Sequence, residues 1–206
     1  PENEYNFSWL DPDKKVSVLQ NRKFRKANRV MLSLNLGLAD NNAYRSSTAI
    51  DPRLAYYFSE SWGIEVFYSI FQNKKNATAE ALATTGVTPS VIELKNQMGV
   101  MLNWVPWYAK INVFNTILQF DWSFSAGAGT INANMIGGSG ESGFAPTTKS
   151  LSAFYLGTGH QFHVSEDFVI RLDFRNAFFK APKRAVTGEE IYFNGTTFQI
   201  GAGFRL

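Results

Sequence analysis

The segment Val30-Met31-Leu32-Ser33-Leu34-Asn35-Leu36-Gly37-Leu38 decides the fold of this chain. Large apolar side chains occupy every second position, and mainly small or polar side chains lie between them. An α-helix would scatter the apolar residues around its axis, whereas a β-strand places them on one face, because successive side chains of a strand point to opposite sides. The segment therefore predicts a strand with one apolar and one polar face.

The same alternation recurs along the rest of the 206 residues and predicts seven further strands, at about 49–59, 63–71, 92–104, 116–129, 150–163, 167–178 and 196–206. The connections alternate between long ones, at 41–48, 72–91, 130–148 and 179–195, and short ones, at 60–63, 105–115 and 164–167. This alternation is typical of an up-and-down barrel with its long loops at one end. Among the connections at the short-turn end, 105–115 is longer than expected for a turn, and we interpret it as an interfacial segment under the barrel wall. At the other end, Asn194-Gly195 is a strong turn signal.

The distribution of charge indicates which face points inward. The apolar faces carry no charged residue, and the opposite faces carry five acidic and five basic ones: Asp51, Arg53, Glu65, Glu93, Lys95, Asp121, Arg171, Asp173, Arg175 and Arg205. A lipid-facing wall excludes Arg and Lys at a cost of about 2–4 kcal/mol each near the bilayer midplane. Equal numbers of opposite charges can pair in a confined interior.

We therefore predict an all-β fold, an eight-stranded antiparallel up-and-down transmembrane β-barrel over residues 30–206, with a polar interior filled by side chains. A soluble, lipocalin-like barrel with the opposite orientation of its faces is the alternative. An interior charge network is predicted from Arg53, Glu65, Lys95, Asp121, Arg171, Asp173, Arg175 and Arg205. An interfacial girdle at the short-turn end is predicted from Trp62, Trp104, Trp107 and Tyr108.

Residues 1–29 form a separate arm that holds seven basic and four acidic residues, so it carries the whole net charge of +3. The body is neutral, which argues against a nucleic-acid partner, because such proteins carry a basic face on the folded domain. The arm also contains several large apolar residues, which pure linkers rarely do. We expect part of it to dock across the short-turn mouth or onto a second copy, or to meet anionic lipid phosphates; a disordered tail is the alternative.

The sequence offers little for catalysis. It has no cysteine and two histidines, His160 and His163, which are too few for a convincing metal site. Acyl-chain chemistry would need a histidine beside a serine and a carboxylate. The glycine pairs, such as Gly127 and Gly129, lack the third glycine and the helix of a phosphate-binding loop. We expect no enzyme activity, no cofactor and no metal.

Several segments carry a resemblance to a known family: the arm from Pro1-Glu2-Asn3-Glu4-Tyr5 to Asn21-Arg22, Pro106-Trp107-Tyr108-Ala109-Lys110 with Phe114-Asn115, and Ser125-Ala126-Gly127-Ala128-Gly129. The chain resembles the small eight-stranded outer-membrane barrels of Gram-negative bacteria, of the OmpA and OmpX type. More narrowly, it is similar to an outer-membrane β-barrel family of myxobacteria and Bdellovibrio-like bacteria. The resemblance implies a fold and a place in the outer membrane, and it implies no chemistry.

The leading hypothesis is an integral outer-membrane barrel with a structural or surface-interaction role and with its arm in the periplasm. Its expected partners are the lipid bilayer and lipopolysaccharide, with self-association through residues 1–29, and loops 72–91 and 130–148 are candidate binding segments. A narrow or gated, porin-like channel is the first alternative. A lipid-modifying enzyme of the outer leaflet is the second.

Overall fold

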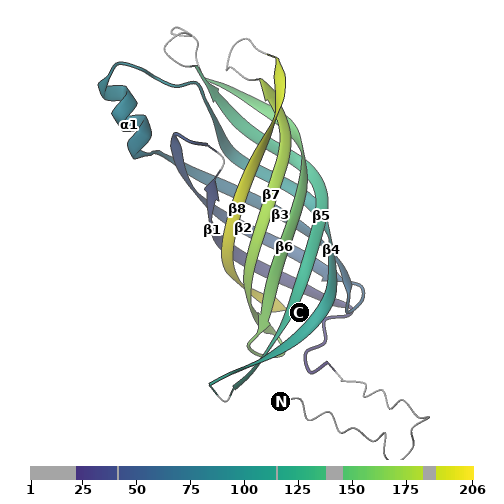
Figure 1. Ribbon diagram of the computed structural model, residues 1–206. Coiled ribbons are helices and arrows are strands. Elements are labelled where there is room, and N and C mark those ends of the chain that lie inside the picture. Colours follow the sequence, from purple (N-terminus) through teal and green to yellow (C-terminus); the bar gives the residue numbers. More distant parts are fainter. Residues whose placement is uncertain (1–21, 41, 115, 138–145, 183–188) are drawn as a thin grey trace, which may run out of the picture.

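The fold is a closed barrel, seen in a computed structural model that describes residues 22–40, 42–114, 116–137, 146–182 and 189–206 (Figure 1). Its strands are β1 (Arg29–Asp40), β2 (Arg45–Tyr57), β3 (Trp62–Lys75), β4 (Val91–Val113), β5 (Thr116–Ile136), β6 (Thr147–His163), β7 (Phe168–Pro182) and β8 (Glu190–Arg205). Each strand pairs antiparallel with the next, and β8 pairs with β1. The predicted eight-stranded antiparallel topology is confirmed.

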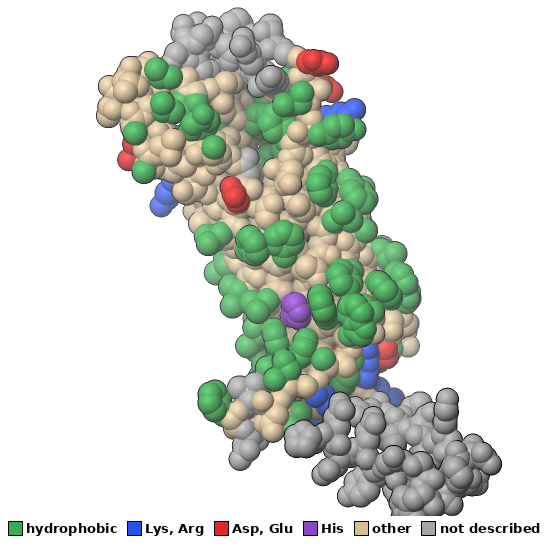
Figure 2. Space-filling view, viewed as in Figure 1, with side chains coloured by type: hydrophobic (Ala, Val, Ile, Leu, Met, Phe, Trp, Pro, Cys, Tyr) green, Lys and Arg blue, Asp and Glu red, His purple; other side chains and the backbone are tan. Residues whose placement is uncertain are grey.

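The apolar faces point outward. Leu34 is 54% exposed and Trp122 is 38% exposed, whereas the side chain of Arg171 is only 3% exposed. Figure 2 shows apolar side chains over the barrel wall, with charged side chains near its two ends. The predicted orientation of the two faces is therefore confirmed by the burial of these residues.

The short-turn end differs from the prediction for 105–115. This segment is not a separate connection, because β4 continues to Val113, β5 begins at Thr116, and the two strands pair again from Trp107 to Val113. A register shift between Trp104 and Trp107 breaks the period of two, so the strand signal is lost in the sequence although the strand continues.

The long-loop end also contains more regular structure than predicted. Asn194 and Gly195 lie within β8, where they pair with Phe178 and Ala177, and they do not form a turn. The connection after β3 contains the helix α1 (Ala77–Thr84), which Asn76 caps by accepting a hydrogen bond from the Ala79 N–H at 3.0 Å. None of the described helices has both the length and the apolar character needed to cross a membrane.

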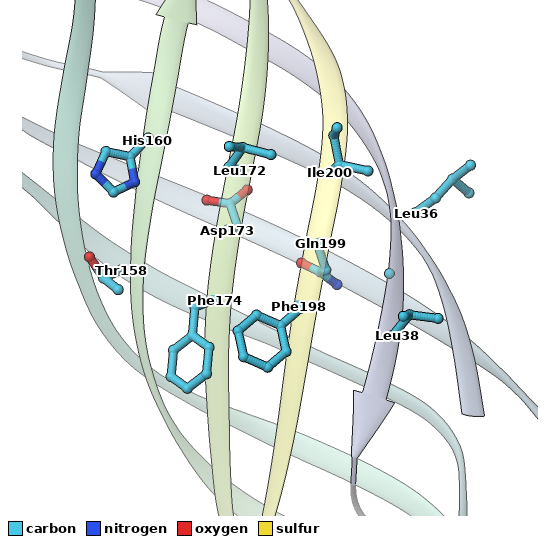
Figure 3. Close-up of a pocket in the computed structure, with 11 residues that line it drawn as sticks. Leu36, Leu38, Thr158, His160, Leu172, Asp173, Phe174, Phe198, Gln199 and Ile200 are labelled. Atoms are coloured by element: carbon cyan, nitrogen blue, oxygen red, sulfur yellow. The ribbon is translucent and has the colours of Figure 1, made fainter. Parts of the chain in front are cut away.

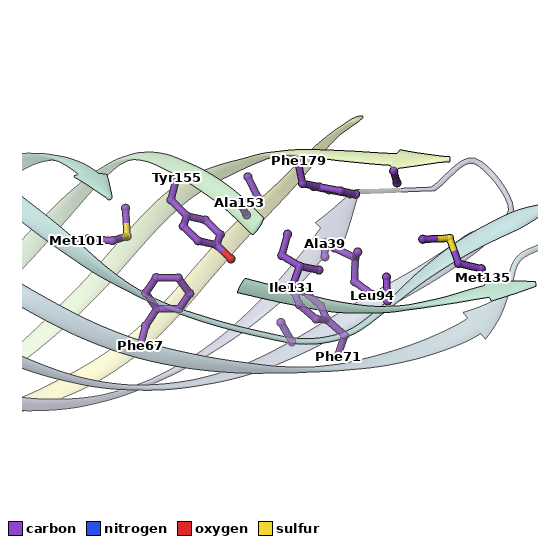
Figure 4. Close-up of a cluster of buried hydrophobic side chains, with 14 residues drawn as sticks. Ala39, Phe67, Phe71, Leu94, Met101, Ile131, Met135, Ala153, Tyr155 and Phe179 are labelled. Atoms are coloured by element: carbon purple, nitrogen blue, oxygen red, sulfur yellow. The ribbon is translucent and has the colours of Figure 1, made fainter. Parts of the chain in front are cut away.

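The interior is polar only in part, which corrects the prediction of a polar lumen. In the half near the long loops, buried apolar side chains form one cluster (Figure 4): Ala39, Ala49, Phe67, Phe71, Leu94, Met101, Ile131, Ala133, Met135, Ala153, Tyr155, Ala177, Phe179 and Ala181. Phe67 and Tyr155 meet there edge to face, with ring centroids 5.0 Å apart. A narrow barrel must fill its interior with side chains, and large apolar ones do so without needing polar partners.

Candidate functional site

The candidate site is the polar half of the lumen, and its centre is Glu65 on β3. Arg53 of β2 donates from Nη1 to Glu65 Oε1 at 3.0 Å, and Arg171 of β7 donates from Nη1 to Glu65 Oε2 at 2.7 Å. Asp173 lies within 3.3 Å of Arg53 and 3.1 Å of Arg171. Two arginines from different strands thus share two carboxylates across the barrel.

A second group of charges lies next to this centre, around Asp51. Arg175 Nη2 and Gln199 Nε2 each donate to Asp51 Oδ2 at 2.5 Å, and Arg53 lies 3.3 Å from the same carboxylate. The guanidinium of Arg175 also lies 3.9 Å from the centroid of the Phe67 ring. Arg175 therefore marks the boundary between the charged layer and the apolar cluster.

The charged layer is electrically neutral, with three guanidinium groups and three carboxylates from β2, β3 and β7: Arg53, Arg171, Arg175, Asp51, Glu65 and Asp173. Burying an unpaired charge costs free energy of desolvation, so removing one partner of a buried ion pair destabilises the fold. The side chains of the layer are at most 9% exposed. The arrangement holds strands from different parts of the barrel together across the lumen.

A further layer of buried polar side chains, separate from the charged layer, closes the short-turn mouth. Lys26, from the arm, donates from Nζ to Asp121 Oδ2 at 2.7 Å, and the two side chains are each 1% exposed. His163 places Nε2 at 3.2 Å from the same carboxylate oxygen, and its Nδ1 contacts Arg205. The Lys26 ammonium also lies 5.0 Å from the centroid of the Tyr57 ring.

The arm residues around Lys26 are fixed by the turn between β2 and β3. The Glu60 carboxylate accepts hydrogen bonds from the backbone N–H groups of Lys26 and Ala27, each with a contact at 3.2 Å. Phe24 is 9% exposed and packs against the His163 ring at a centroid distance of 5.2 Å. Residues 22–28 therefore dock across the mouth of their own barrel, whereas residues 1–21 lie outside the described residues.

Burial has a testable effect on Lys26. Desolvation lowers the pKa of this ammonium from 10.5 to about 8, against the opposing attraction of Asp121. Between about pH 8 and 10.5 the unfolded chain binds more protons at Lys26 than the folded chain, so this group makes folding more favourable as pH rises through that window. We expect the NMR signal of the Lys26 side chain to titrate near pH 8. A Lys26 signal that titrates at the ordinary value of 10.5 would contradict the buried placement.

The charged residues that the sequence predicts for the interior lie at two levels of the lumen. The structure brings Arg53, Glu65, Arg171, Asp173 and Arg175 into the central layer and places Asp121 and Arg205 at the mouth.

The predicted interior position of Lys95 is wrong, because its side chain is exposed. The register shift between Leu94 and Asn96 reverses its orientation in β4. Glu93, in the same part of the strand, pairs with Arg45.

The aromatic residues at the short-turn end also divide into two groups. Trp62, Trp104 and Trp107 are 40%, 44% and 52% exposed on the outer wall, and the rings of Trp62 and Trp104 stack at 6.1 Å. Tyr108 is instead half-buried at the mouth, where its hydroxyl donates to Gln119 and its ring lies 5.0 Å below the Arg22 guanidinium. The prediction that Tyr108 belongs to the girdle is therefore wrong, since the shift before Trp107 turns its side chain toward the arm.

The two histidines do not meet in one site. His160 faces the outer wall, where it stacks on Trp122 at 5.3 Å beside a groove of about 480 Å³ (Figure 3). Both ring nitrogens of the buried His163 already contact charged partners, Asp121 and Arg205. Within the described residues, no group of three or more His, Cys, Asp or Glu side chains is arranged to hold a metal ion.

Sequence reasoning missed Lys26 as a lumen residue. The arm is rich in basic residues, and its sequence does not distinguish Lys26 from Lys23 or Arg25, which are exposed. The only available signal was Asp121, a carboxylate predicted to face inward near the mouth.

Comparison with known proteins supplies the family. A family model described as "Outer membrane protein beta-barrel domain" matches residues 17–205. No curated protein sequence matches this chain.

Among solved structures, the N-terminal β-barrel domain of Pseudomonas aeruginosa OprF is similar with a TM-score of 0.54 and 11% identity, over 87% of this chain and 98% of that one. The outer membrane protein OprG from Pseudomonas aeruginosa is similar with a TM-score of 0.50 and 11% identity, over 90% of this chain and 99% of that one. At this identity the likeness shows the fold alone. The narrower similarity to myxobacterial and Bdellovibrio-like proteins stays a prediction.

Proposed function

The chain belongs to the outer membrane protein β-barrel domain family of bacterial outer membranes, and from this premise we propose that it is a closed, non-conducting barrel with a structural or surface-interaction role. The single observation that carries the proposal is the buried charged layer across the lumen, in which Glu65 joins Arg53 and Arg171. An ion crossing the barrel would have to separate these pairs, at a cost that buried charges make high.

The orientation in the membrane is part of the same proposal. Outer-membrane barrels have short turns on the periplasmic side and long loops outside. We place the docked arm in the periplasm and the long loops at the cell surface. Exposed lysines lie in the outer parts of the strands and supply cations for lipopolysaccharide phosphates: Lys74, Lys75, Lys95, Lys149 and Lys180.

Surface interaction is assigned to the long-loop end. Helix α1 stands there beyond β3, and its described residues are mostly exposed (Figure 1). The candidate loops 72–91 and 130–148 both open at this end, although 138–145 lie outside the described residues. Loops on a rigid scaffold are common binding segments, so replacing residues 76–90, which lie between β3 and β4, should alter adhesion without altering barrel folding.

We propose no enzymatic role. A catalytic histidine needs a free ring nitrogen beside a nucleophile. His163 is engaged on both nitrogens, and His160 stacks on Trp122 at the outer wall. An unchanged lipid A mass spectrum on expression of the chain supports this proposal, and a mass shift would contradict it.

A gated channel is the second candidate, because Lys26 reaches the mouth from a segment outside the barrel wall. Planar-bilayer recordings of the full chain and of Lys26→Ala test both candidates. Unboiled gel migration establishes that each sample is folded. Absence of steady unitary currents in both proteins supports the closed barrel. Currents in the full chain would overturn it, and currents in Lys26→Ala alone would indicate a channel that the arm closes.

A further inference from the structure

The hairpin of β4 and β5 extends past the rest of the barrel at the short-turn end (Figure 1). Pairing between β3 and β4 ends at Trp62 and Trp104, whereas pairing between β4 and β5 continues to Val113 and Thr116. The Val105 N–H donates to the Ser61 carbonyl at 2.7 Å. Beyond this contact, no described strand pairs with β4 on its β3 side, so residues 106–113 form a free strand edge.

A free edge presents unpaired backbone groups and readily accepts another extended segment. Pro106 stands at the start of this edge, where a missing N–H is tolerated. Trp107 and Ile111 are 52% and 45% exposed on one face of the hairpin. A segment that pairs here would find backbone partners and an apolar surface together.

The docked arm enters the mouth at the start of this edge. Arg22 donates to the Glu60 carbonyl at 2.8 Å, and its guanidinium lies over the Tyr108 ring. Glu60 belongs to the turn beside the free edge, and Tyr108 belongs to the edge itself. Arg22, the first described residue of the arm, therefore lies next to β4.

We propose that residues 14–21 of this chain pair with the free edge, residues 106–113 of β4, as an additional antiparallel strand. Residue numbers in the arm increase toward the barrel, whereas those in β4 increase away from it, so the pairing is antiparallel. Both segments have eight residues, or about 26 Å of extended chain.

The sequence of the arm segment suits this place. Val16 and Val18 are β-branched residues at alternating positions, which strands favour. The proposed register places Val16 beside Ile111 and Val18 beside Ala109, so both valines join the apolar face of the hairpin. The family match begins at residue 17, within this segment. This pairing can form whether or not the barrel conducts ions.

Disulfide formation tests the pairing in the full chain, which has no cysteine of its own. Val18→Cys combined with Ala109→Cys should form a bond within one chain on mild oxidation, because cross-strand partners have the required spacing. Val18→Cys combined with Ile117→Cys is the matched control, because Ile117 lies on β5, the other strand of the same hairpin. Equal bonding in both variants, or bonding only between two chains, would overturn the proposal; the second result would indicate that a second copy covers the edge.

Amide hydrogen exchange gives an independent measurement. The amides of residues 107–113 that do not bond to β5 should exchange at least about tenfold more slowly in the full chain than in Val18→Pro, a factor that corresponds to about 1.4 kcal/mol. Proline removes one donor from the arm, and it leaves residues 22–28 unchanged. The Lys26 resonance reports whether residues 22–28 remain docked in Val18→Pro. If that resonance is unchanged and the amides of residues 107–113 exchange equally fast in the full chain and in Val18→Pro, the proposal is overturned.

Discussion

Replacing Glu65 by glutamine is expected to lower the free energy of unfolding by about 3–5 kcal/mol. The carboxylate accepts hydrogen bonds from Arg53 and Arg171, and all three side chains are at most 4% exposed. Glutamine retains the volume but removes the negative charge, so the layer gains an uncompensated positive charge. Urea titration of the barrel refolded in lipid vesicles, followed by tryptophan fluorescence, measures the loss.

The matched control is Glu80→Gln on helix α1, an exposed carboxylate at the long-loop end. It should change stability by no more than about 0.5 kcal/mol. Combining Glu65→Gln with Arg171→Met should cost less than the sum of the two single changes, because the second change removes one of the uncompensated cations. If Glu65→Gln lowered the free energy of unfolding by less than about 1 kcal/mol, the ion pairs of Glu65 would contribute no more than solvent-exposed ion pairs do. That result would contradict the role of Glu65 in holding the lumen together.

The strands were predictable because alternation of polarity follows directly from strand geometry. Leu34 and Ile170 face outward and Arg53 and Arg171 face inward, as the period of two requires. The closed antiparallel order also follows from the alternation of long and short connections.

Errors arose where one residue interrupts the period. The register shift near Lys95 turns that side chain outward, and the shift before Trp107 turns Tyr108 toward the mouth. A bulge reverses the orientation of the residues on one side of it relative to those on the other. Pro106 is a signal for the second shift, because proline within a strand is confined to edges and bulges, whereas no residue type marks the shift at Lys95.

The contents of the lumen were only partly predictable for a different reason. Charges at inward positions were easy to recognise, but Phe67, Ile131 and Phe179 also point inward and fill the half of the lumen near the long loops. Lys26 reaches Asp121 across 95 residues of sequence, a contact that depends on how the arm enters the mouth. Local pattern cannot supply such a long-range contact.

Replacing Leu34 by arginine is expected to destabilise the barrel by about 2–4 kcal/mol in lipid vesicles. Leu34 lies in the middle of β1, pairs with Pro52 and Ala202, and is 54% exposed on the outer wall. In a bilayer this exposed surface contacts acyl chains, and an arginine there must be desolvated or must distort the lipid around it. Equilibrium unfolding in vesicles gives the difference from the unchanged chain.

Leu206→Arg provides the matched control, because Leu206 follows the end of β8 at the rim and is 64% exposed. The same substitution near the membrane interface should cost only about 0–1 kcal/mol. The contrast between the two positions separates lipid from water as the solvent of the outer wall, because in water an exposed leucine can become arginine at little cost wherever it lies along the strand. Equal effects at Leu34 and Leu206 would therefore contradict a transmembrane wall, whereas a depth-dependent cost requires the apolar face of β1 to lie against the hydrocarbon core.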